Sequence, residues 1–303
     1  MNRLIKCELI KEFKKISFKL LILLIIVSSF LTCYISYKKV NDNYNIYPEI
    51  EMNNSQNKLI KNYNIYALNI NKINELSNIK LNKIMENGIT LLIFSSIIII
   101  VISSSILGNE INKKSIKELL TKPYKRSEIL ISKFITMYII IFLLTMFIFI
   151  TYILFVYILT KINVFILKDY IIYNGHIKNI SFILKYFIKF IINSIPIYFL
   201  STFTIFLTTF IKNQKIIIPI NSLLFIMSPV IFNFFLNVKF KYIIYTFIPY
   251  LDFSIFKDAY SILMLNMKYN MNFNILLGII TLIIYSIVFL LLSLFIFNEK
   301  DYY

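Results

Sequence analysis

The stretch FITMYIIIFLLTMFIFITYILFVYILT, residues Phe134–Thr160, decides the fold class of this 303-residue chain. It contains no charged residue, and it is longer than the ~20 apolar residues that cross the hydrocarbon layer of a bilayer as a helix. Its apolar residues follow one another without the alternation that a membrane β-strand shows. The stretch therefore predicts a membrane-spanning helix, in which every backbone hydrogen bond is made within the segment.

Further apolar runs of the same kind lie before and after this one. Hydrophobic residues make up 58% of the chain and the mean hydropathy is +0.74, which is more apolar surface than one soluble core of this length can bury. We therefore predict an all-α membrane protein, a single membrane domain over residues 1–303 with about six transmembrane helices. The predicted spans are approximately 18–37, 89–107, 134–160, 186–211, 216–236 and 275–297.

The N-terminal segment Met1–Lys19 combines basic and apolar residues at helical spacing. One face of a helix here would carry Ile5, Leu9, Phe13, Ile16 and Leu20. The opposite face would carry Arg3, Lys11, Lys14 and Lys15. A helix of this kind lies in the headgroup plane with its apolar face toward the hydrocarbon. We expect an interfacial amphipathic helix ahead of the first span.

The distribution of Lys and Arg gives the predicted orientation. If the N-terminus is placed in the cytoplasm, the inner segments hold roughly twice the Lys and Arg density of the outer loops. This predicts both termini in the cytoplasm of a multi-pass protein of the cell membrane, with an extracellular loop at 38–87 and a cytoplasmic segment at 108–133. A further crossing at Lys241–Phe256 is disfavoured by Pro249 and Asp252, and a re-entrant or surface segment is favoured there.

The net charge of +17 could suggest a nucleic-acid partner. The basic residues, however, lie in short segments beside apolar runs. That placement is typical of membrane topology, and it also attracts anionic lipid headgroups. We therefore expect membrane lipid, and no nucleic acid, among the partners.

Residues for catalysis are scarce. His176 is the only histidine and follows Gly175 in a loop, and Cys7 and Cys33 have no metal-ligand spacing. Four glycines cannot build a phosphate-binding loop. The predicted spans contain no Asp or Glu, although ion-coupled transporters place carboxylates near the bilayer midplane. We predict that the chain is not an enzyme and has no catalytic residue, metal or cofactor of its own.

Hydroxyl and amide side chains are the polar groups that remain inside the predicted spans. A stripe of the fourth span and one position of the fifth carry Ser194, Ser201, Thr204, Thr208 and Asn221. Interhelical packing is the favoured explanation for these residues. A polar-lined substrate path is the alternative.

The segment 108–133, GNEINKKSIKELLTKPYKRSEILISK, carries the most functional information. Glu110 near the start of a helix, with lysines further on, suits the helix dipole. Pro123 would end this helix, Tyr124–Arg126 would form a turn, and Ser127 would cap the next helix. We predict a short helix, a turn and a helix leading into the third span, and we call residues 108–133 the elbow. A basic loop that only fixes topology is the alternative.

The elbow resembles the cytoplasmic loop of type-two ABC transporter permeases. The matching positions are Glu110, Ile116, Leu119, Leu120, Thr121, Pro123, Arg126, Ile129, Leu130, Ser132 and Lys133. Lys114 and Ser115 depart from the Gly-Thr that is usual in the family. The basic N-terminus, the six-span layout and the ending FNEKDYY are also similar to that family.

The resemblance implies a permease subunit that is powered by a separate ATP-binding subunit, so that ATP is bound by the partner. It implies that the elbow is a coupling helix and that the permease pairs with a second copy or a homologue. The residues expected to contact the ATPase are Glu110, Ile116, Leu119, Leu120, Pro123, Tyr124 and Arg126. By analogy with the family, the cargo would be a peptide antibiotic or another hydrophobic compound, in export or immunity, with sodium export as an alternative.

Two alternative functions of other classes also fit the sequence. One is a secondary transporter or channel, against which the absent midplane carboxylates argue. The other is a membrane scaffold that recruits partners through its elbow without transporting anything.

Overall fold

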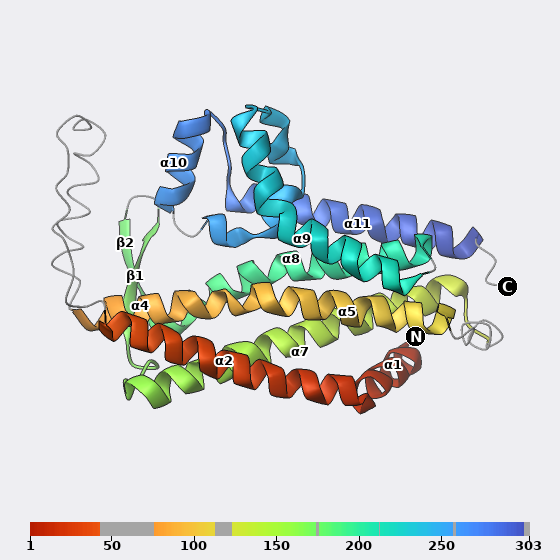
Figure 1. Cartoon of the computed structure of the whole chain (residues 1–303), viewed down its shortest axis with the longest axis horizontal. Helices are drawn as coiled ribbons and strands as arrows, with labels where there is room; N and C mark the ends of the chain where they lie inside the picture. The colour runs from red at the N-terminus through yellow and green to blue at the C-terminus, as the bar shows by residue number, and fades with distance from the viewer. Residues whose placement is uncertain (43–75, 113–122, 174–175, 212, 257–258, 300–303) are drawn as a thin grey trace.

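The computed structural model describes residues 1–42, 76–112, 123–173, 176–211, 213–256 and 259–299 (Figure 1). Within these residues, six helices are long and apolar enough to cross a membrane, which confirms the predicted fold class. The spans are α2 (Ile16–Asp42), the end of α4 (Leu76–Ile89) with α5 (Leu91–Asn112), α7 (Arg126–Thr160), α8 (Phe182–Phe210), α9 (Gln214–Asn237) and α11 (Ile275–Glu299).

The spans pack as one bundle with α8 at its centre. Helix α8 contacts α5, α7, α9 and α11, and it is the most buried of the six spans. Helix α2 packs mainly against α7 and α4, on the side of the bundle away from α9 (Figure 1). Large apolar side chains on the outer faces of α2, α9 and α11 are exposed, as expected for helices that face hydrocarbon or another membrane subunit.

Helix α7 is a single helix of 35 residues. At a rise of 1.5 Å per residue it is about 52 Å long, so it extends well beyond the ~30 Å hydrocarbon layer. The predicted second helix of the elbow is therefore the first turns of the third span, without a break between them. A force on the start of α7 would act directly on the whole helix.

The two ends of the bundle differ in what they carry. At one end lie α1 (Asn2–Lys14), the end of α5, the start of α7 and the end of α11, and we call it the elbow end (Figure 1). The other end carries α4, the start of α8 and an antiparallel hairpin of β1 (Lys168–Tyr173) and β2 (His176–Ser181), and we call it the hairpin end. The expectation that His176 lies in a loop is wrong, because it is the first residue of β2 and pairs with Tyr173.

The expected loop at 38–87 also contains regular structure at both of its ends. Helix α2 continues to Asp42, and α4 begins at Leu76. The Gly88 position explains the close approach of α4 to α7, because a Cβ there would collide with the Tyr152 ring. The Tyr152 hydroxyl donates a hydrogen bond to the Ile84 carbonyl oxygen at 2.5 Å, which fixes the same contact.

The segment between α9 and α11 folds against the bundle without being a candidate span. It contains the 3-10 helices η3 (Lys241–Tyr245), η4 (Ile248–Leu251) and η5 (Phe253–Phe256), followed by α10 (Ala259–Tyr269). Tyr250 is fully buried and its ring packs on Gly278 of α11. Lys241–Phe256 therefore forms short 3-10 helices and no candidate span, in agreement with the prediction that it does not cross the membrane.

Candidate functional site

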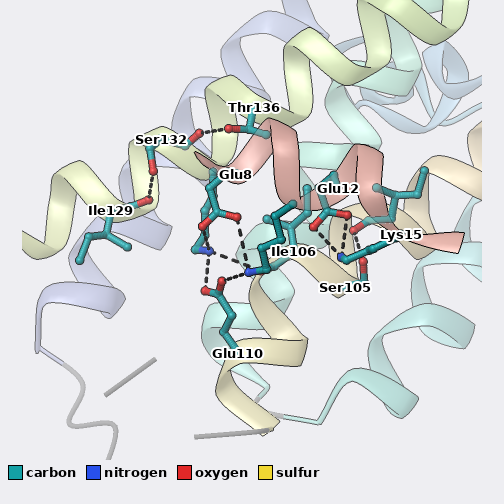
Figure 2. A network of polar contacts seen from close by, with 12 residues as sticks. Glu8, Glu12, Lys15, Ser105, Ile106, Glu110, Ile129, Ser132 and Thr136 are labelled. Carbon is teal, nitrogen blue, oxygen red and sulfur yellow. Dashed lines mark hydrogen bonds and ion pairs between the residues drawn. The ribbon is translucent and has the colours of Figure 1, made fainter. Parts of the chain in front are cut away.

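Four charged side chains meet at the elbow end, where three helices come together. Glu8 and Lys11 come from α1, Glu110 from the last turn of α5, and Lys133 from α7 (Figure 2). We call these four residues the charge network. Its two carboxylates and two ammonium groups balance, so the network has no net formal charge.

Lys133 lies at the centre of the network and has no solvent exposure. Its Nζ is 3.0 Å from Glu8 Oε1, 2.5 Å from Glu110 Oε2 and 3.4 Å from the Ile106 carbonyl oxygen. The contacts with Glu8 and with the Ile106 carbonyl oxygen are hydrogen bonds that Lys133 donates, and the contact with Glu110 is an ion pair. Burying an unpaired ammonium group costs roughly several kcal/mol. The contacts with Glu8, Glu110 and Ile106 therefore make the buried position of Lys133 possible.

Lys11 closes the network from its more exposed side. It forms a hydrogen bond and an ion pair with Glu110, and its Nζ is 3.6 Å from Glu8 Oε2. Partial burial by itself would lower the pKa of Lys11. The hydrogen bond to Glu110 and the charges of Glu110, Glu8 and Glu12 outweigh burial, so the pKa of Lys11 is raised above its ordinary value of 10.5.

Helix α1 turns an acidic side toward the bundle. Glu8 and Glu12 are buried, one helical turn apart, and Glu12 accepts hydrogen bonds from Lys15 at 2.6 Å. Phe13 and Ile16, expected on the side facing hydrocarbon, are 38% and 75% exposed. The side of α1 that packs on the protein therefore carries the two glutamates together with Leu9, which contacts the apolar core.

The turn of the elbow lies beside the end of α11. Arg126 is the first residue of α7, and its guanidinium donates a hydrogen bond to the Asn298 carbonyl oxygen at 3.0 Å. The carbonyls of a helix's last turn lack partners within the helix, so an arginine there also complements the helix dipole. Pro123 is exposed and Tyr124 is half-buried, just ahead of the helix.

The comparison with protein families agrees with this architecture. The model of a family described as ABC-2 family transporter protein matches residues 4–302. The chain belongs to this family. It is thus a membrane-spanning subunit of a transporter, an ABC transporter permease. No curated protein sequence matches it.

The residues expected to couple this ABC-2 permease to an ATPase fall into two groups. Ile116, Leu119 and Leu120 lie outside the described residues. Among the others, Glu110 is 4% exposed and points into the charge network, while Arg126 contacts the end of α11. Contact with an ATPase stays a prediction for all of them, and the geometry gives Glu110 an internal role as well.

The candidate substrate-path residues lie between α8 and α9 or on the inner side of α8. All four hydroxyl groups of the set donate to carbonyl oxygens of their own helix, one turn earlier; they belong to Ser194, Ser201, Thr204 and Thr208. Asn221 of α9 donates to Thr204 Oγ1 at 2.5 Å and to the Leu200 carbonyl oxygen at 3.3 Å. This pattern is typical of interhelical packing in membranes. A role in a substrate path stays a prediction.

The sequence reasoning named Glu110 but missed its partners. Lys133 appeared only as a motif position, and Glu8 was not selected. The available signal was the pair Glu8 and Glu12, four residues apart in an otherwise basic and apolar helix, because such a pair lies on one face and requires cations. The ion pairs of the two lysines at the start of α8 were also not identified from the sequence. Lys185 pairs with Asp169 at 2.7 Å and Lys189 pairs with Glu86 at 3.5 Å.

Proposed function

We propose that the chain is the membrane subunit of an exporter that a separate ATP-binding subunit drives through the elbow. The observation that carries this proposal is the charge network, which joins the root of the elbow to α1 and α7. ATP hydrolysis in a partner can move the permease only if a displacement of the elbow reaches the spans. The network supplies that mechanical connection.

The mechanism follows from where the network lies. Glu110 lies two residues before the end of α5, and Lys133 is in the second turn of α7, so both arms of the elbow are attached to the same point. Glu8 attaches α1 to that point as well. A partner that pushes the elbow would therefore move three helices as one body, which is the element that a rigid-body transition requires.

The elbow end is the cytoplasmic end in this proposal. The higher Lys and Arg density of the segments expected inside supports that orientation. Helix α1 and the end of α11 also lie at the elbow end, consistent with both termini in the cytoplasm (Figure 1). An ATP-binding subunit in the cytoplasm would then reach Pro123 and Tyr124 directly.

The proposed assembly contains two permeases, either two copies of this chain or this chain and a homologue. The exposed apolar faces of the spans provide the surface for such pairing and for contact with lipid. The proposed cargo is a peptide antibiotic or another hydrophobic compound, in export or immunity. Family membership supports the transport role, and the cargo rests on analogy alone.

The test measures coupling in the assembled complex. We expect the chain to co-purify with an ATP-binding subunit, and we expect the double variant Leu119→Asp, Arg126→Glu to abolish the stimulation of its ATP hydrolysis. Lys168→Glu, a charge reversal at the hairpin end, is the matched control and should hydrolyse ATP normally. Since Arg126 also contacts Asn298, the single variant Leu119→Asp is included, and its loss of stimulation should be nearly as large. Normal stimulation in the double variant would overturn the coupling role.

A further inference from the structure

Two adjoining cavities open at the hairpin end, away from the charge network. The larger lies between α4, α8, η5 and the start of α11. The smaller lies between α5, α8, α9 and η4. The two share Ile89, Asn193, Phe253 and Ser254 as lining residues, so they adjoin one another.

The charges around this space do not balance. Glu86 and Lys189 line the larger cavity and form an ion pair at 3.5 Å, with their side chains 38% and 24% exposed. Asp252 lines the smaller cavity and accepts a hydrogen bond from the Ser254 backbone N–H at 2.8 Å. Among the described residues, no cation pairs with Asp252. Within the described lining of the two cavities, two carboxylates and one ammonium group leave an excess of one negative charge.

The remaining walls are apolar and aromatic. Phe253 and Phe256 of η5 and Ile192 of α8 face the larger cavity, and Phe225 of α9 faces the smaller one. These side chains suit a hydrocarbon group, while Asn193 and Ser254 offer hydrogen bonds near the junction of the cavities. The space therefore combines a large apolar wall with an uncompensated carboxylate, which are the two features that an amphipathic cation recognises.

We propose that these cavities bind an amphipathic cation, with its positive charge beside Asp252 and its apolar part against Phe253 and Phe225. The proposal names a substrate class for the transporter and rests on the proposed function for that role. Binding itself requires no ATPase. The Glu86–Lys189 pair at the mouth can exchange its internal contact for a contact with the ligand, because a partly exposed pair at 3.5 Å is weak.

The binding test uses the absence of tryptophan from the chain. In Ile275→Trp the indole is the only one in the chain, and it lies at the lining of the larger cavity, where it reports occupancy. The protein is reconstituted in lipid nanodiscs and titrated with hexyltrimethylammonium, hexyl sulfate and hexanol. We expect saturable fluorescence change with the cation at a concentration at least tenfold lower than with the anion or the alcohol. A second reporter, Leu223→Trp on the exposed face of α9, measures partition into lipid.

Asp252→Asn in the reporter background tests the charge. The amide oxygen of Asn can still accept from the Ser254 N–H, so the turn is kept while the negative charge is lost. We expect at least tenfold weaker binding of the cation and unchanged binding of hexanol. Glu299→Gln removes a carboxylate at the elbow end and should leave the titration unchanged.

The outcomes separate this proposal from the proposed function. Equal binding of cation and anion, or no effect of Asp252→Asn, would overturn the cation site even if ATPase coupling is observed. Selective cation binding together with normal ATP hydrolysis in the elbow variants would leave the site standing and overturn the coupling role. A response at Leu223→Trp without a saturable response at Ile275→Trp would also overturn the site, because it would report lipid partition alone.

Discussion

The charge network at the elbow end and the cavities at the hairpin end hold their charged groups in opposite ways. At the elbow end, Glu8, Lys11, Glu110 and Lys133 form a balanced network around a fully buried ammonium group. At the hairpin end, Glu86, Lys189 and Asp252 line open cavities, are partly exposed and carry an excess negative charge. The paired charges of the network hold helices together. The excess negative charge beside the cavities can still attract a positively charged ligand.

The largest effect is expected from Lys133→Met. The variant leaves Glu8 and Glu110 buried beside a group of similar size that has no charge. Breaking a buried ion pair by removing one partner costs about 3–5 kcal/mol, so the free energy of unfolding should fall by that order. Thermal unfolding of the purified protein in detergent, followed by size-exclusion chromatography, measures the change.

Lys189→Met is the matched variant at the hairpin end. Its pair with Glu86 is longer and more exposed, so we expect a loss below about 1 kcal/mol. Adding Glu8→Gln and Glu110→Gln to Lys133→Met should recover part of the stability, since it removes the buried carboxylate charges that Lys133 had compensated. If Lys133→Met and Lys189→Met unfold at the same temperature, the proposed difference between the two ends is wrong.

An intermediate effect is expected at the wall of the cavities. A Cβ at Gly278 would collide with the Tyr250 ring, and η4, which carries Tyr250, leads directly to Asp252 and Phe253. Gly278→Val should therefore displace this wall and cost about 1–3 kcal/mol through overpacking. Increased proteolysis within Lys241–Phe256 measures the displacement.

Tyr250→Ala provides the control for this contact. Combined with Gly278→Val, it should cost less than the sum of the two single variants, because the smaller side chain makes room for valine. Additive losses would show that Gly278 and Tyr250 act independently. Cation binding should fall with Gly278→Val and stay normal with Lys133→Met in the fraction that folds.

The six spans could be predicted because continuous apolar runs have one solution in a bilayer, a helix. The stretch Phe134–Thr160 has no competing interpretation, and the structure makes it part of α7. The charge network could not be predicted in the same way. Glu8 and Lys133 are 125 positions apart, and their contact depends on how α1 turns when it packs on α7, which periodicity within α1 does not determine.

At the elbow and at the cavities, too, contacts between distant segments could not be predicted from the sequence. The pattern around Pro123 correctly predicted a helix start, but the predicted cap was wrong: α7 begins at Arg126 with Lys125 as its N-cap, and Ser127 lies inside the first turn. Its contact with Asn298, however, requires the last span to end at the elbow. Asp252 was used in the sequence only as an argument against a further crossing, and its place in a cavity arises from the packing of η4 and η5 on α8 and α9.

The smallest effect concerns Lys11, the exposed member of the network. Its folded-state pKa is raised above 10.5, so its contribution to stability is fully present below pH 10.5 and is lost as the pH rises through the folded-state value. The side chain is 45% exposed, so solvent screening keeps this contribution below about 1 kcal/mol. The stability difference between the native protein and Lys11→Met should be constant near neutral pH and shrink above pH 10.5. A difference that instead grows with alkaline pH would mean that Glu110 and Lys11 do not hold each other in their charged forms. The balance assigned to the elbow end would then have to come from Lys133 alone.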